Sequence, residues 1–135
     1  MKIINKTLKL ILASAIFVLF TYCEKDNDTR QVTYLLTGLE QDFQVSYINE
    51  QGKTINDNIE PVNDDAVWTY SFDAQKGDIL YLYIRFLDTD LDPTKFKFRI
   101  LINGKVYKDA YGCDKEDTET IPISYVVKRA GTVPY

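Results

Sequence analysis

The chain has 135 residues, of which 16 are basic and 20 acidic, so its net charge is −4, and it contains no histidine. An acidic chain repels phosphate backbones, which argues against nucleic acid as a partner. The lack of histidine excludes Ser-His-Asp and Cys-His catalytic arrangements and imidazole-based zinc sites, and two cysteines are too few for an all-thiolate zinc site.

The first 22 residues have the pattern of a secretory signal. Lys2, Lys6 and Lys9 precede an uncharged run from Leu10 to Phe20. This run is too short to span a bilayer, which takes roughly 18–20 apolar residues, but it matches the charged and apolar regions of a signal peptide. We therefore predict that residues 1–22 are a lipoprotein signal peptide.

Cys23 follows this run and begins a polar segment. The boundary resembles that of bacterial lipoproteins, in which the cysteine becomes the acylated first residue of the mature chain. Tyr22 departs from that pattern, because a small residue usually precedes the cysteine. An ordinary signal peptide cut elsewhere and an uncleaved anchor are the alternatives. Because two or more acyl chains anchor a protein stably, we expect an outer-membrane lipoprotein that faces the periplasm or the cell surface.

Residues 23–31 are predicted to be the lipidated cysteine and a flexible polar tether, and residues 32–135 a single folded domain. The leader carries three of the 16 basic residues and none of the 20 acids, so the remaining chain has a net charge of −7. A domain of this size buries roughly 60–70% of its unfolded surface, which is enough for a core.

The domain alternates apolar and polar residues with a period of two, which indicates β-strands, and no helical period is sustained after the leader. Strands are predicted over residues 31–38, 43–48, 66–72, 78–87, 95–102, 105–112 and 121–127, and a weak strand over residues 53–59. Asn103-Gly104 predicts a type I′ hairpin turn. Residues 78–87 are apolar on both sides, which predicts a central strand covered on both faces. Residues 73–78 and 113–120 are predicted to be connections between strands. About seven short strands favour an all-β, antiparallel β-sandwich.

A series of short motifs follows a fixed order between Val32 and Gly112. They are Val32-Thr33-Tyr34, Thr37-Gly38, Val45-Ser46-Tyr47, Asn49 to Gly52, Trp68, Gly77-Asp78 and Ile100 to Val106. In this order they resemble MmpS-type transport accessory proteins and related small bacterial β-sandwich lipoproteins. The resemblance implies an immunoglobulin-like sandwich outside the cytoplasmic membrane and, from the mycobacterial members, a role in assisting an export pump.

The chain departs from that family in two respects. Its mycobacterial members keep an N-terminal membrane helix, whereas this chain has a predicted lipidation signal at Cys23. They often carry a pair of cysteines, one of them in the strand that here contains Phe98, and this chain keeps only Cys113. We interpret Cys113 as an idle thiol whose pKa is raised by Asp114, Glu116 and Asp117; a disulfide to a second molecule is the alternative.

Asp88, Asp90 and Asp92 alternate along a predicted loop, and carboxylate oxygens are the ligands that calcium prefers. The loop does not fit an EF-hand, because Pro93 stands where glycine is required and Arg99 where a bidentate glutamate is required. A calcium site of another kind stays an alternative to a solvated loop whose acids cap a turn. We predict no metal and no cofactor.

Six aromatic residues could include a platform that stacks on carbohydrate or peptide, although aromatic residues in strands more often belong to the core. They are Trp68, Tyr70, Phe72, Tyr81, Tyr83 and Tyr107. Carboxylates in residues 60–65 and 114–119 have no spacing that selects a glycosidase pair, and no catalytic residue is predicted.

These observations predict a membrane-anchored lipoprotein whose non-catalytic β-sandwich docks on an envelope protein, such as a transporter. The alternative is a surface lipoprotein that binds a glycan or another external ligand through its outward-facing tyrosines.

Overall fold

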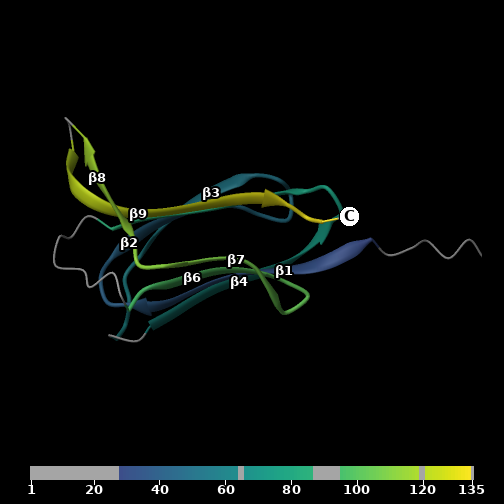
Figure 1. Ribbon diagram of the computed structural model, residues 1–135, viewed down its shortest axis with the longest axis horizontal. Helices are drawn as coiled ribbons and strands as arrows, with labels where there is room; N and C mark the ends of the chain where they lie inside the picture. Colours follow the sequence, from purple (N-terminus) through teal and green to yellow (C-terminus); the bar gives the residue numbers. More distant parts are fainter. Residues whose placement is uncertain (1–27, 64–65, 87–94, 119–120, 135) are drawn as a thin grey trace, which may run out of the picture.

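The computed structural model describes residues 28–63, 66–86, 95–118 and 121–134, which form nine strands in two antiparallel sheets (Figure 1). The four-stranded sheet has the order β4-β1-β6-β7, and its strands are β1 (Thr29–Leu39), β4 (Ala66–Gln75), β6 (Lys97–Ile102) and β7 (Lys105–Tyr111). The five-stranded sheet has the order β3-β2-β5-β9-β8, and its strands are β2 (Phe43–Ile48), β3 (Thr54–Ile59), β5 (Ile79–Phe86), β8 (Asp114–Thr118) and β9 (Ile121–Thr132). The predicted β-sandwich is confirmed, with more strands than the seven expected.

The strand order follows the immunoglobulin pattern in both sheets. In that fold strands B and E pair in one sheet, and strands C, F and G pair in the other. Here β1 and β4 take the places of B and E, while β2, β5 and β9 take the places of C, F and G. The β6–β7 hairpin lies on the other side of β1, where strand A lies in an immunoglobulin domain.

The core lies between the two sheets and follows the alternation of the sequence. Leu80, Leu82, Ile84 and Phe86 of β5 face inward and are buried, and each such side chain contributes about 1.5–3 kcal/mol when it leaves water. The alternate residues of β5 face outward and remain partly or largely exposed. The prediction that this strand is covered on both faces is therefore wrong, because the second sheet covers only one face.

The Asn103-Gly104 turn is confirmed by backbone angles. Asn103 has a φ of 50° and Gly104 a φ of 75°, the left-handed values that a type I′ turn requires at both positions. Asn103 also ties this turn to β1: its N–H donates to the carbonyl of Gln31 at 2.8 Å, and its Oδ1 accepts from the N–H of Gln31 at 3.0 Å.

Three segments differ from the prediction in their length or type. β1 begins at Thr29, inside the predicted tether, because Thr29 pairs with Gln75 of β4. The same pairing extends β4 beyond Phe72, through residues predicted to form a turn. Residues 113–120, predicted to be a charged loop, contain β8, which lies at the edge of the five-stranded sheet, and charged residues are common in edge strands.

The described residues contain no helix that is long and apolar enough to cross a membrane. The predicted leader with Cys23, and the loop with Asp88, Asp90 and Asp92, lie outside the residues that the structure describes.

Candidate binding surfaces

Tyr34 projects from β1 of one sheet and reaches the backbone of the other. Its hydroxyl donates a hydrogen bond to the carbonyl of Ile48 at 3.2 Å and accepts one from the N–H of Tyr81 at 3.4 Å. The ladder between β2 and β5 ends one residue earlier, at Tyr47 and Leu82. The hydroxyl thus bridges the two strands at the point where their own pairing stops, and burial raises the pKa of Tyr34 to about 12.

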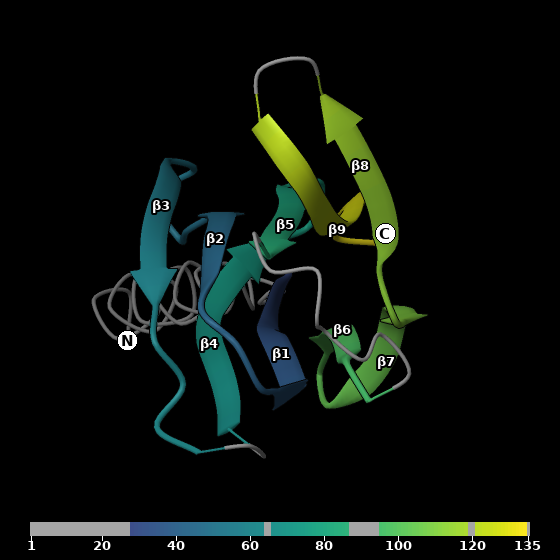
Figure 2. The same cartoon turned by 90° about the vertical axis from the view of Figure 1, so that its left-hand side faces the viewer.

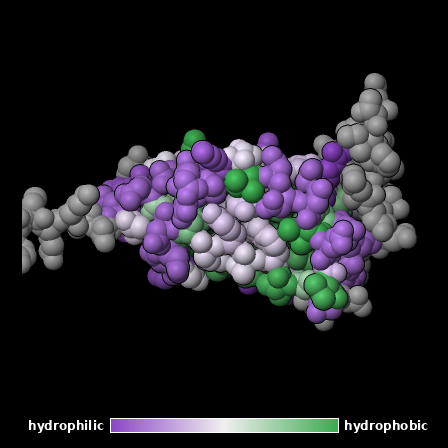
Figure 3. Space-filling view, turned by 180° about the vertical axis from the view of Figure 1, so that it is seen from behind, coloured by the Kyte–Doolittle hydropathy of each residue, from purple (hydrophilic) through white to green (hydrophobic). Residues whose placement is uncertain are grey.

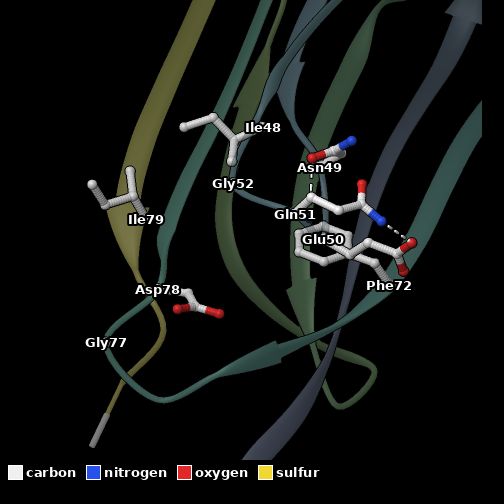
Figure 4. A pocket seen from close by; sticks show the side chains of 9 residues that line it. All are labelled: Ile48, Asn49, Glu50, Gln51, Gly52, Phe72, Gly77, Asp78 and Ile79. Carbon is white, nitrogen blue, oxygen red and sulfur yellow. Dashed lines mark hydrogen bonds between the residues drawn. The ribbon is translucent and has the colours of Figure 1, made fainter.

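A groove of about 430 Å³ opens beside this point (Figure 4). The turn after β2, the turn before β5 and the ring of Phe72 form its wall. The lining residues are Ile48, Asn49, Glu50, Gln51, Gly52, Phe72, Gly77, Asp78 and Ile79. Asn49 Oδ1 accepts from the N–H groups of Gln51 and Lys53, both at 3.0 Å, and Asp78 Oδ2 accepts from the N–H of Gln75 at 2.7 Å. These two oxygen atoms hold the turns, and the groove combines the remaining polar groups of Glu50, Gln51 and Asp78 with an apolar wall.

A second hollow of about 630 Å³ lies at the other end of β2. Its apolar wall is formed by Phe43 and Ile59, and it also contains charged groups of both signs from Asp42, Glu60 and Arg85. This mixture does not select one class of ligand.

The outer side of the five-stranded sheet carries a set of residues that we call the tyrosine face: Gln44, Ser46, Tyr81, Tyr83, Arg85 and Lys128. Tyr83 of β5 stands between Ser46 of β2 and Lys128 of β9, which are its partners on the two neighbouring strands. The ammonium of Lys128 lies 5.7 Å from the centre of the Tyr81 ring. Rings flanked by amide, hydroxyl and cationic groups form a surface on which a sugar ring can stack and hydrogen-bond.

The predicted aromatic platform is divided by the fold. Trp68, Tyr70 and Phe72 of β4 face inward and pack on the core, where Tyr47 contacts Trp68 and Tyr70 with ring centres 5.4 and 4.7 Å apart. Tyr81 and Tyr83 of β5 face outward and are only partly buried. Only these two of the six aromatic residues lie together on an outer surface.

Tyr107 closes one side of the sandwich. Its ring packs on the backbone of β9 so closely that a Cβ added at Gly131 would lie 2.8 Å from the ring. Val106, its neighbour on the opposite side of the strand, points outward and is 52% exposed.

The four strand edges of the sandwich are not equivalent. Figure 2 looks along the strands and shows β3 and β4 on one side, with β7 and β8 on the other. β7 carries Lys105 and Lys108 and a register shift against β6, and β8 consists mainly of charged residues and also has a register shift. β3 is short and polar. Charges, irregularity and shortness are the usual means by which proteins protect a free edge from further pairing.

β4 has fewer of these protections: it carries one charged residue, Asp73, and its pairing with β1 shifts register only between Trp68 and Ala66. It is ten residues long and pairs with β1 without a break from Trp68 to Gln75. The run from Ala66 to Phe72 contains no charged residue, no proline and no glycine. Figure 3 views the side formed by β3 and β4, where apolar side chains reach the surface, most of them toward the right-hand end of the view. In the described part of the chain, the outer edge of β4 has no strand beside it.

Cys113 is a free thiol that packs partly against the core. Burial, and to a smaller extent the carboxylate of Asp114, raises the pKa of Cys113 to about 12. The predicted direction is confirmed, although burial outweighs the acidic neighbours. Within the described ranges, no three His, Cys, Asp or Glu side chains are grouped closely enough to hold a metal ion.

No protein-family model matches the chain, and no curated protein matches it in sequence. The resemblance to MmpS-type proteins therefore stays a prediction.

Sequence reasoning missed the free edge of β4 and the partners of the two outward tyrosines. One signal was present: an uncharged run from Ala66 to Phe72, whereas the other edge strands, β3, β7 and β8, all contain charged residues. The position of that run at an edge could not be read from the sequence.

Proposed function

We propose that this protein is a membrane-anchored, non-catalytic interaction module that binds an extended segment of a protein along the free edge of β4. The observation that carries the proposal is the contrast among the four edges. β3 is short, and β7 and β8 carry several charges and register shifts. β4 is ten residues long, pairs regularly with β1 from Trp68 to Gln75 and has seven consecutive uncharged residues. An added strand pairs its backbone with such an edge, and each net hydrogen bond contributes about 0.5–1.5 kcal/mol.

Specificity would come from side chains on the two faces of the added strand. On the outer face, Val67 is 60% exposed and Thr69 and Ser71 are also exposed. On the inner face, Trp68 and Tyr70 are half-buried and offer aromatic surface to a neighbour. A partner segment with alternating apolar residues would cover both sets.

Binding at β4 is tested by placing a photoreactive amino acid at Thr69 in the full chain, in its own membrane. We expect a cross-linked product that Val67→Lys removes, because a lysine on the edge opposes pairing. The matched control is the same photoreactive group at Thr54, which is also exposed but lies on the polar strand β3. Equal products from both positions, or a product that Val67→Lys leaves intact, would contradict the proposal.

Anchoring through Cys23 is the second part of the proposal, and a transport accessory in the cell envelope is one role that such a module could fill. Mass spectrometry of the mature N-terminus should find diacylglycerol on Cys23. Cys23→Ala should release the domain from the membrane or leave the precursor uncut. A correctly processed Cys23→Ala protein that stays on the membrane would exclude lipid anchoring at this residue.

Glycan binding at the tyrosine face is a second candidate, favoured by the position of Tyr83 between Ser46 and Lys128. A sugar can no longer stack on an aromatic ring once the ring is removed, so Tyr83→Ala should abolish the signal that the native protein gives on a glycan array. Tyr70→Phe, a conservative change on the inner face, is the control that should leave such a signal unchanged. An array on which the native protein gives no signal would eliminate this candidate.

A further inference from the structure

One end of the sandwich gathers the start of the described chain and three of the turns between strands. Thr29 of β1 pairs with Gln75, the last residue of β4, so the β4–β5 turn lies beside the beginning of β1. Asn103 of the β6–β7 turn bonds to Gln31, and Val133, after β9, bonds to the β4–β5 turn. The groove of about 430 Å³ has the β2–β3 and β4–β5 turns in its wall, which places the β2–β3 turn at the same end. We call this end, toward which β9 points in Figure 1, the turn end; it comprises residues 28–30, 49–53, 75–79, 103–105 and 132–134.

The predicted lipid anchor is close to the turn end along the chain. Cys23 precedes Thr29 by six residues, and even a fully extended chain of that length spans at most about 22 Å. From Thr29 to Leu39, β1 alone extends about 33 Å along the sandwich. A chain anchored at Cys23 is therefore too short to let the domain stand upright on its opposite end. An upright domain can stand only on the turn end, and any other contact with the bilayer requires it to lean over onto a side.

The turn end exposes an apolar side chain. Ile79, the first residue of β5, is 63% exposed and lines the groove together with Ile48 and Phe72 (Figure 4). Apolar side chains that project from a surface in this way are stabilised when they enter the boundary between headgroups and acyl chains. Four other large hydrophobic side chains of the described residues are strongly exposed, and all lie outside the turn end: Val62, Val67, Val106 and Tyr111.

The charges of the turn end permit contact with an anionic bilayer. Its basic residues are Arg30, Lys53, Lys76 and Lys105, and its acidic residues are Asp28, Glu50 and Asp78. Four bases against three acids give this end a net charge of +1, although the chain after the leader is acidic as a whole. Anionic lipids attract basic groups near the surface, so this end is repelled less than the rest of the domain.

We propose that the domain stands on the bilayer with its turn end, and that Ile79 and the apolar wall of the groove contact the lipid. The inference rests on the proposed function, because it requires the lipid on Cys23. It also extends that function: β4 then stands upright, with Gln75 near the membrane and Ala66 away from it, so its free edge stays open to a partner segment.

The experiment uses the full chain, purified with its lipid and placed in vesicles of phosphatidylethanolamine and phosphatidylglycerol that contain a nitroxide-labelled headgroup lipid. A fluorophore is attached to one introduced cysteine in a Cys113→Ser background, and the nitroxide quenches it only at short range. Ile79→Cys is compared with Val67→Cys and Tyr111→Cys, whose native side chains are similarly exposed, at 60% and 63%, but lie toward the opposite end. We expect the label at Ile79 to lose most of its emission and the other two labels to lose little.

Each other outcome has a definite meaning. Similar losses at Ile79 and at Val67 or Tyr111 would show that the domain lies on a side, and the inference would be wrong. No loss at any position, in protein that floats with the vesicles, would overturn the inference and leave lipid anchoring intact. Protein that does not float with the vesicles would overturn both. Circular dichroism of each labelled variant excludes misfolding as the cause.

A second comparison tests the contribution of Ile79 itself. With the fluorophore at Gln51, which also belongs to the turn end, Ile79→Asp should restore much of the quenched emission, because a carboxylate opposes entry into lipid. Val67→Asp places the same charge outside the turn end and should leave the emission of the Gln51 label unchanged. Equal emission from the two variants would contradict a lipid contact through Ile79.

Discussion

The hydroxyl of Tyr34 accepts a hydrogen bond from the backbone N–H of Tyr81, 3.4 Å away on the opposite sheet. The same hydroxyl donates to the carbonyl of Ile48. A side chain of one sheet therefore completes the backbone pairing of the other, next to the groove that Ile48 and Phe72 line. The two sheets are joined there by directional bonds in addition to apolar contact.

Tyr34→Phe should destabilise the domain by about 1–3 kcal/mol, because the carbonyl of Ile48 and the N–H of Tyr81 lose their buried partner. Denaturant unfolding of both proteins measures the difference. An unchanged free energy of unfolding would mean that β2 and β5 pair directly when the hydroxyl is absent.

High pH should reduce the difference in free energy of unfolding between the native protein and Tyr34→Phe. Folding raises the pKa of Tyr34 from its ordinary value of 10 to about 12, so the folded state holds the proton that the unfolded state loses. Its contribution to stability is complete below pH 10 and falls by about 1.4 kcal/mol per pH unit up to pH 12. Unfolding of both proteins across this range checks the prediction, and parallel pH curves would contradict it.

Gly38 and Gly52 offer a matched pair, since both have a φ of 71°. A Cβ at Gly52 meets no atom within 4 Å, whereas a Cβ at Gly38 would clash with the carbonyl oxygen of Lys95. Gly52→Ala should cost about 1–2 kcal/mol from backbone conformation alone. Gly38→Ala should cost about 3 kcal/mol or more, because the backbone must also move. Equal losses in thermal melting would show that the contact with Lys95 yields easily.

Gly131→Ala should destabilise the domain by about 1–3 kcal/mol, because the new methyl group displaces the ring of Tyr107. In a Tyr107→Ala background the same change should cost much less. The difference between the two costs is the coupling that a double-mutant cycle measures. Additive costs would place the strain of Gly131→Ala elsewhere.

Cys113 should react slowly with iodoacetamide in the folded protein. Its raised pKa, about 12 against an ordinary 9.0, lowers the thiolate population at neutral pH roughly a thousandfold, and the thiolate is the reactive form. Labelling of the Cys113 peptide in native and denatured protein, followed by mass spectrometry, measures the ratio. Similar rates in both states would contradict burial of this thiol.

Much of the fold could be predicted from local patterns. The alternation in β1 predicted its buried face, with Val32, Tyr34 and Leu36, and Asn103-Gly104 predicted its turn, because each depends on residues adjacent in the chain. The lengths of β1 and β4 were underestimated, since the pairing of Thr29 with Gln75 joins residues far apart in sequence. The candidate surfaces were predicted only in part: the outward tyrosines were among six aromatic residues that the sequence could not separate.

The sequence by itself determined the two faces of each strand, since side chains alternate along an extended backbone whatever the strand's neighbours are. It also determined the uncharged run of β4. Only the tertiary structure decided that β4 lies at an edge, that Trp68 points into the core while Tyr83 points to water, and that the Tyr34 hydroxyl meets the other sheet. The physical reason is that a strand's neighbours are selected by packing and backbone pairing over the whole chain, which no local pattern encodes.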